Sequence, residues 1–360
     1  IGGGVFVALL NLLMFSGVET MSEADKVAVY VRIYELALAI PLISVLGVAL
    51  GGAIKLRDIR RLHAKGYHWH EARSLVAPRP ERTAPNWWIL GGGLVFVLFT
   101  VGMGLNDIPY NQEIIFAGSL AIVVFLMRRL LGTLDATARR TLLGTAIVIF
   151  VYRAMPAAGA GASWWEIDVL GFDQRFLSVL SLIASSLTLL GMFVFRRFMA
   201  ERSIAYVVVF LTVAGTLLSL PLVGMYYGLH EWTARLTGGV VDARFIAVVD
   251  TALTSPLGQI AMIPMLAWIA NSAPASLKAT FFAVMASFTN LALSLAQLGT
   301  KYANRVFAVS REVRDRATGA VTVPADYSEL GMLLIAVTLI GFALPIAAVL
   351  IIRRTHLESA

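Results

Sequence analysis

Long runs of apolar residues, separated by shorter polar stretches, make up most of the chain. A membrane-crossing helix needs about 20 mainly apolar residues. These runs must be helices, because lipid satisfies no backbone hydrogen bonds and because the runs are too long and too uniformly apolar for barrel strands. The pattern predicts ten spans, at residues 1–18, 27–54, 87–106, 113–131, 141–158, 176–195, 203–228, 244–271, 278–298 and 330–352.

The overall composition is that of a chain that lies in a bilayer. It is 58% hydrophobic and 14% charged, against about 45–50% and 25% in soluble domains. The longest polar stretches, 55–86 and 299–329, are shorter than the roughly 40 residues that an unaided core needs. The sequence shows no phosphate-binding loop, catalytic triad or paired-carboxylate site. We therefore expect neither an enzyme nor a cofactor.

Basic residues are distributed unequally between the two sides of the predicted membrane. Of the 29 Lys and Arg residues, 18 fall on one side and ten on the other, with Arg153 inside a span; the acidic residues show the opposite bias. The side rich in Lys and Arg is cytoplasmic by the positive-inside rule, which places the C-terminus in the cytoplasm. The net charge of +7 then reflects orientation in a membrane, which we expect to be the bacterial inner membrane, and not nucleic-acid binding.

Ten helices in this orientation fit a twelve-helix plan if two more precede residue 1, which we expect because the sequence lacks an initiator Met. Residues 132–140 then link two six-helix halves, of which 1–131 is the remainder of the first and 141–360 the second. Two such halves with both ends cytoplasmic are the plan of the major facilitator superfamily. We expect an all-α helical bundle of that type, present as a monomer.

One predicted span, 278–298, carries polar side chains along one face. Polar groups are costly in lipid, so a polar face marks a helix beside a cavity. Primary amides are harder to leave unsatisfied than hydroxyls, which makes Asn290 and Gln297 candidates to line that cavity. For the hydroxyl residues, packing between helices is an equal alternative. The face comprises Thr280, Ser287, Asn290, Ser294 and Gln297, and Lys301 continues it.

Two charged residues, Arg153 and Asp250, lie within predicted spans. As a pair in a cavity they can dock an anionic substrate on the arginine and carry a coupling proton on the carboxylate. The alternative is a structural ion pair, or side chains that reach the membrane surface. Arg32 and Glu35 make a weaker second pair, for which an intrahelical pair at the membrane edge is the alternative.

Helix-breaking residues follow both of these charges. Pro156 precedes a run of small residues, and Gln259 lies among Pro256, Gly258 and Pro264. Proline and glycine interrupt membrane helices, and the backbone groups that such breaks expose hold substrates or ions in transporters. We expect the three prolines and Gly258 to form helix breaks with a gating role, and Gln259 to line the cavity.

A histidine cluster in the cytoplasmic segment, His63, His68 and His70 with Glu71, lacks the spacing of a zinc-type HExxH motif. We expect a solvated segment at the membrane surface and no metal site. The absence of cysteine excludes disulfides and thiolate metal sites. The outer segment 310–329 is also expected to be solvated and mobile.

Three segments in the second part of the chain carry a family pattern. They are YRAMPAAGAGASWWEIDVLGFDQRFLSVLS, DTALTSPLGQIAMIP and SAPASLKATFFAVMASFTN. The first has a proline, an aromatic pair and a following L-G-F, and the second has an Asp, a central Gln and a Pro. The third is the most specific. With these segments, residues 150–352 resemble the folate-biopterin transporter family within the major facilitator superfamily.

The resemblance can be carried over residue by residue. The third segment matches the family at Pro274, Ala279, Thr280, Phe282, Ala283, Ser287 and Asn290. The resemblance implies that six residues match those of the family at their positions: Pro156, Asp250, Gln259, Pro264, Thr280 and Asn290. The chain departs from the family at Val249, where Gly is common, at Ala273, where Cys is frequent, and at Lys278, where the family has an acid.

The resemblance implies a secondary active transporter, embedded in the lipid bilayer, that moves a small organic anion such as a folate or pterin by alternating access. The intramembrane carboxylate suggests that it is a symporter coupled to H⁺. A non-transporting membrane scaffold or assembly factor on a transporter fold is the alternative, in which the polar faces only pack against each other. A channel fits poorly, because the sequence shows no ring of repeated charges and no filter-like segment.

Overall fold

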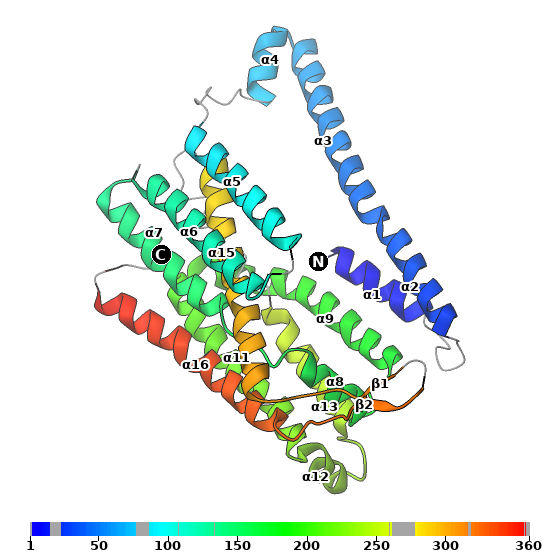
Figure 1. The fold of residues 1–360 in the computed structure, drawn as a ribbon. Coiled ribbons are helices and arrows are strands. Elements are labelled where there is room, and N and C mark those ends of the chain that lie inside the picture. Colours follow the sequence, from blue (N-terminus) through cyan, green and yellow to red (C-terminus); the bar gives the residue numbers. More distant parts are fainter. Residues whose placement is uncertain are drawn as a thin grey trace. The chain divides into compact units, whose positions relative to one another are not determined.

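The apolar runs fold into helices, whose backbone hydrogen bonds are satisfied within each helix (Figure 1). The computed structural model describes residues 2–14, 23–76, 86–106, 108–132, 134–258, 260, 278–315, 318–355 and 357. Within these residues, seven helical stretches are long and apolar enough to cross a membrane. The predicted all-α membrane bundle is therefore confirmed.

The smaller of two compact units comprises Ile1–Pro85 and Gln174–Ser185. Its first four helices pack in sequence order, each against the next. A turn at Gly66, which has a φ of 97°, reverses the chain between the third and fourth helices. The bounds are α1 (Gly2–Met14), α2 (Glu23–Ala37), α3 (Ala39–Ala64) and α4 (Trp69–Val76).

The larger unit comprises Asn86–Asp173 and Ser186–Ala360. It contains most of the helices and a short antiparallel hairpin. The bounds are α5 (Trp87–Gly104), α6 (Asn111–Leu131), α7 (Ala136–Arg153), α8 (Ala160–Asp168), α10 (Arg196–Glu201), α11 (Ile204–Tyr226), α12 (Leu229–Leu236), α13 (Ala243–Thr254), η2 (Ser255–Leu257), α15 (Lys278–Val306), β1 (Val313–Arg314), β2 (Val321–Val323) and α16 (Leu330–Arg354). Helix α9 (Gln174–Val194) contributes its second part.

Side-chain caps set the starts of several of these helices. The Asp135 carboxylate accepts a hydrogen bond from a backbone N–H in the first turn of α7, and Asp242 does the same for α13. Ser203 and Asn86 cap α11 and α5 in this way. Caps of this kind satisfy N–H groups that have no partner within the helix.

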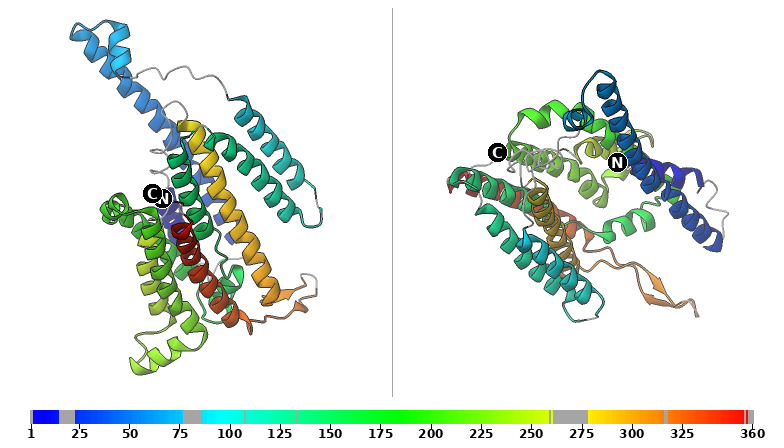
Figure 2. Two further views of the ribbon diagram at one scale, coloured as in Figure 1. Left: turned by 90° about the vertical axis from the view of Figure 1, so that its left-hand side faces the viewer. Right: turned by 90° about the horizontal axis from the view of Figure 1, so that it is seen from above.

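The core of the larger unit lies where α7 meets its neighbours. Helix α15 packs against α6 and α7, and α16 packs against α7 and α11. Phe281, Met285, Leu142 and Val148 are buried there. Helices α5 and α6 form a pair, and Figure 2 shows this pair beside α15. The arrangement places the polar face of α15 toward α5 and α6.

The described residues of the segment after α15 include a hairpin, which the sequence did not predict. Strands β1 and β2 pair antiparallel, and a further bridge joins Ser310 to Asp326. The Tyr226 hydroxyl, on α11, donates to the carbonyls of Tyr327 and Ser328 at the end of the segment. These contacts between distant parts of the chain hold the segment, and periodicity along the sequence cannot reveal them.

Four predicted spans take a different form in the structure. Of residues 1–18, α1 covers Gly2–Met14 and is shorter than the seven stretches, and residues 15–18 lie outside the described residues. Residues 27–54 fall in two helices, α2 and α3, which meet at Leu38. Helix α7 carries three arginines and is not among the seven apolar stretches. The span 244–271 is interrupted, because α13 ends at Thr254 and η2 follows. Residues 261–277 lie outside the described residues.

Candidate functional site

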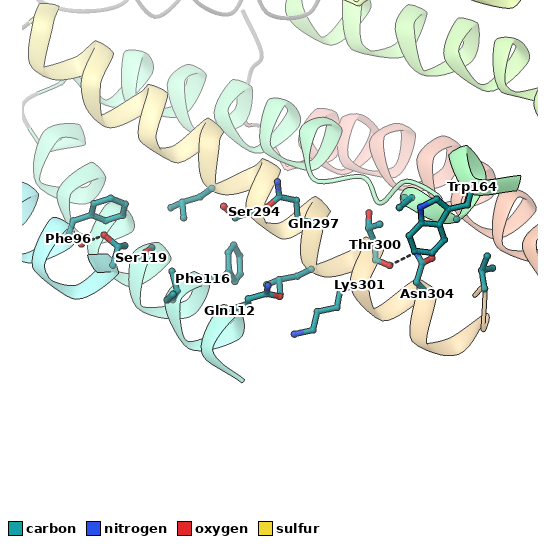
Figure 3. A pocket seen from close by; sticks show the side chains of 18 residues that line it. Phe96, Gln112, Phe116, Ser119, Trp164, Ser294, Gln297, Thr300, Lys301 and Asn304 are labelled. Atoms are coloured by element: carbon teal, nitrogen blue, oxygen red, sulfur yellow. Dashed lines mark hydrogen bonds between the residues drawn. The ribbon is translucent and has the colours of Figure 1, made fainter. Parts of the chain in front are cut away.

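A cavity of about 890 Å³ lies in the larger unit, between α5, α6, α8 and α15. Figure 3 shows side chains from these elements around it. Its size falls within the roughly 300–1,000 Å³ of small-molecule sites. The polar residues that line it are Thr100, Gln112, Ser119, Ser294, Gln297, Thr300, Lys301 and Asn304, and the aromatic residues are Phe96, Phe116 and Trp164.

Helix α15 supplies much of the polar lining. Ser294, Gln297 and Lys301, three members of the predicted polar face, line the cavity. Ser287 lines a separate cavity of about 120 Å³ between α15, α5 and α6. Asn290 is exposed and does not line the large cavity. Part of the polar face therefore faces a cavity in the structure.

The aromatic lining comes from three different helices. Phe96 lies on α5, Phe116 on α6 and Trp164 on α8. Gly161 lets α8 approach the segment after α15, because a Cβ at that position would lie 2.8 Å from Val309 Cγ1. The aromatic faces offer apolar contact to a flat ring, while the amides and hydroxyls offer hydrogen bonds at its edge.

The predicted break after Arg153 is present. Helix α7 ends at Arg153, and the chain passes through Pro156 before α8 begins. Side chains of α15 bind the exposed backbone: the Thr300 hydroxyl accepts from the Ala157 N–H at 3.0 Å, and the Asn304 amide donates to the Ala158 carbonyl at 3.1 Å. At the end of this break Gly159 lines the large cavity, whereas residues 155–158 line a second cavity of about 430 Å³. The gating role of the break stays a prediction.

A second break follows α13, where Pro256 lies in η2 and Gly258 ends it. Helix α9 supports this break, because the Thr188 hydroxyl donates to the Ser255 carbonyl at 2.9 Å. A Cβ at Gly191 would overlap the Pro256 backbone, so the glycine permits this close approach. The remaining residues predicted here, Gln259 and Pro264, lie outside the described residues.

The charges predicted to face a common cavity do not form an ion pair within the described residues. Arg153 Nε and Asp250 Oδ1 are each buried without a hydrogen-bond partner in that part of the chain. Neither residue lines the large cavity. Asp250 is near Glu166 of α8, and burial followed by the Asp250 charge raises the pKa of Glu166. Two carboxylates, and not an opposite pair, are thus neighbours here.

The second predicted pair lies in the smaller unit. Arg32 and Glu35, both on α2, are exposed, and no ion pair joins them in the described structure. In the same unit, the rings of His63 and Trp69 are in contact, with centroids 4.7 Å apart and planes tilted by 33°. No group of three or more possible metal ligands comes together among the described residues.

An anchor on the outer segment positions α8, which carries Trp164. Arg311 donates two hydrogen bonds to the Asp168 carboxylate, at 2.9 and 3.1 Å, and the Tyr327 hydroxyl donates a third at 2.6 Å. These bonds, with that from Arg311 the strongest, lower the pKa of Asp168. Burial, and then the bond to Asp168, raises the pKa of Tyr327 to about 12.

Among the described residues that were predicted for the site, Gln297 is the one that lines the large cavity. Lys301 was recognisable from the sequence, because it continues the polar face of α15. Trp164 carries no such signal, since an indole near a span end is equally typical of the membrane interface. Gln112 and Asn304 come from distant segments, and only the tertiary fold brings them together.

Comparison with known proteins gives two findings. The sequence model of the BT1 family matches residues 99–359, more than two thirds of the chain. A protein of Synechocystis sp. (strain ATCC 27184 / PCC 6803 / Kazusa), named "Folate-biopterin transporter", is 28% identical over 158 residues, which are 44% of this chain and 31% of that protein. The match thus spans about a third of the relative's length. No solved structure matches the chain.

Proposed function

Because this chain belongs to the BT1 family, we propose that it is a secondary active transporter of a small organic anion of the folate or pterin type. The name of the Synechocystis relative supports this substrate class. The observation that carries the proposal is the cavity between α5, α6, α8 and α15, with its aromatic walls and polar edge.

The cavity lining suits a flat, nitrogen-rich ring. The side chains of Phe96, Phe116 and Trp164 provide apolar faces. Gln112 and Gln297 each carry a carbonyl acceptor and an NH₂ donor, which match the alternating donors and acceptors of a pterin edge. A site that hydrogen-bonds a ligand in this way rejects analogues that lack those groups, because its own polar groups would then stay unpaired.

Alternating access is supported by where the cavity lies in the predicted plan. Helices α5 and α6 fall in the predicted first half, and α8 and α15 in the second, so the cavity is lined from both. Halves that rock against each other expose such a site to each side in turn. The backbone breaks at Pro156 and Pro256 are supported by side chains of neighbouring helices, and we propose that they serve as hinges.

Ligand binding by the full-length, detergent-purified protein tests the proposal. Pterin at about a hundred times its dissociation constant would stabilise the wild-type protein by about 2.7 kcal/mol. Gln297→Leu removes an amide at nearly constant size and should weaken binding about tenfold. Gln174→Leu is the same change outside the cavity lining and should leave binding unchanged. If no pterin or folate stabilises the folded protein, the scaffold alternative is favoured.

A further inference from the structure

The large cavity contains a charge that is already neutralised. Among the described residues that line it, Lys301 is the one with a charged side chain. Figure 3 shows Lys301 extending from α15 on the side of Gln112, which lies in the first turn of α6. The next residue of α6, Glu113, does not line the cavity but contacts this lysine.

The contact between Lys301 and Glu113 is a close ion pair that joins α15 to α6. Lys301 Nζ lies 2.7 Å from Glu113 Oε1, and the Tyr302 hydroxyl donates to the same oxygen at 2.8 Å. The other oxygen, Oε2, is buried without a hydrogen-bond partner in the described part of the chain. The Glu113 carboxylate is thus held through one oxygen only.

This pair differs from the other ion pairs of the described residues in how deeply it is buried. The side chains of Lys301 and Glu113 are 29% and 22% exposed. In each of the other ion pairs of the described residues, at least one side chain is 43% or more exposed. Partial burial makes the electrostatic interaction stronger, and it makes an unpaired charge costly. Each of the two charges therefore loses a favourable interaction when it is left without a partner of opposite charge.

An anionic ligand in the cavity can reach Lys301, which lines it, whereas Glu113 does not line the cavity. Lys301 has three N–H donors, of which one is used by Glu113. While Glu113 is bound, the net charge of the pair is zero, and a ligand carboxylate gains little from it. A ligand carboxylate that takes the place of Glu113 keeps the lysine paired, and Glu113 keeps its hydrogen bond from Tyr302.

We infer that Glu113 is an internal counter-ion of Lys301, which a ligand carboxylate displaces when it binds in the cavity. The inference rests on the proposed function and adds to it a specificity rule and a link to movement. Ligands with a carboxylate compete with Glu113, whereas neutral ligands bind without disturbing the pair. Because the pair joins α6 to α15, displacement also removes a direct connection between these two helices.

Two probes that differ in one carboxylate test the inference. Binding of pterin and of pterin-6-carboxylate is measured at pH 7 with the purified full-length protein. Glu113→Gln removes the competing charge, so it should tighten binding of the carboxylate probe about tenfold and leave pterin unchanged. In the double variant that combines Glu113→Gln with Lys301→Gln, the tighter binding of the carboxylate probe should be lost. Glu113→Asp keeps the charge on a shorter side chain, and should give a smaller gain in the same direction.

The outcomes separate this inference from the proposed function. If wild-type protein binds neither probe, the proposed function fails, and the inference fails with it. If pterin binds but Glu113→Gln leaves the ratio of the two affinities unchanged, or changes both affinities equally, the inference alone is overturned. Glu113→Asp gives the same decision if the glutamine variant does not fold.

Discussion

The conformation of the segment that joins α7 to α8 depends on single residues. Gly159 has φ 74° and ψ −156°, a conformation that is essentially restricted to glycine. A Cβ there would also lie 2.9 Å from the Thr300 Cγ2 methyl. Thr300 accepts the hydrogen bond from the Ala157 N–H, so strain at Gly159 acts directly on the backbone that lines the cavity.

Gly159→Ala should therefore destabilise the protein. The expected loss is about 1–3 kcal/mol, from the unfavourable backbone conformation, and thermal unfolding in detergent measures it. Gly102→Ala is a suitable control, because this glycine lies inside α5 and a Cβ there meets no atom within 4 Å. An unchanged melting temperature in Gly159→Ala would contradict the strained geometry.

For single residues, the sequence predicted which polar side chains share a helix face better than it predicted which residues face each other in the fold. The polar face of α15 was readable because helical spacing is local, and it led to Gln297 in the cavity lining. Arg153 and Asp250 were paired in the prediction because both are charges in apolar spans. Helical spacing fixes which face a residue lies on, but not which helix it faces. The structure accordingly places Asp250 near Glu166 instead.

At the element scale, the hairpin of β1 and β2 is fixed to α8 through one carboxylate. Asp168 accepts bonds from both Arg311 and Tyr327. Glu329 also accepts from the Ala308 N–H, which ties the two ends of the segment together. The many charges of residues 310–329 suggested a solvated loop, but several of those charges are paired. The bonds to Asp168 join residues more than a hundred positions apart, which the local sequence cannot reveal.

The anchor should be stable over a wide range of pH. The pKa of Asp168 is lowered, so its contribution is complete above the usual Asp value near 4 and is lost as the pH falls through the lower folded value. The pKa of Tyr327 is raised to about 12, so its contribution is complete below its usual value near 10 and is lost as the pH rises through about 12. The rate at which the anchor opens should therefore stay constant from about pH 5 to 9. Trypsin cleavage at Arg311 and Arg314 measures this rate.

Asp168→Asn should increase this tryptic cleavage severalfold at neutral pH, because it weakens the bonds to Arg311 and Tyr327. Glu312→Gln is the matched control. The Glu312–Arg314 pair lies at the hairpin and is exposed, and exposed ion pairs contribute little to stability. Equal cleavage of wild type and Asp168→Asn would show that the carboxylate does not hold the hairpin.

For the whole molecule, hydropathy and charge predicted the class of protein. Apolar runs of about 20 residues dictate membrane helices wherever they occur, so the all-α bundle followed without tertiary information. The division into halves at 132–140 stays a prediction, as do the C-terminal orientation and the two additional helices. Interruptions such as that at Thr254 were foreseen from proline and glycine, but their supporting contacts were not.

Proton coupling is a property of the whole transport cycle, and Asp250 is the residue proposed for it. Asp250→Asn should abolish accumulation driven by a pH gradient in proteoliposomes, because the amide cannot carry a proton. Exchange of labelled for unlabelled substrate should persist. Glu231→Gln, the same kind of change at an exposed position on α12, should retain both activities. Full pH-driven accumulation by Asp250→Asn would exclude the coupling role.

Among the described residues, the side-chain hydrogen bonds that α15 makes to other elements come from five consecutive positions, 300–304. Thr300 and Asn304 bind the backbone after α7, and Lys301 binds Glu113 of α6. A helix rises about 1.5 Å per residue, so a shift of one residue along the axis would lengthen and weaken these 2.7–3.1 Å contacts at the same time. We therefore expect any movement of α15 to disturb the contacts to α6 and to the segment after α7 together, and not one after the other.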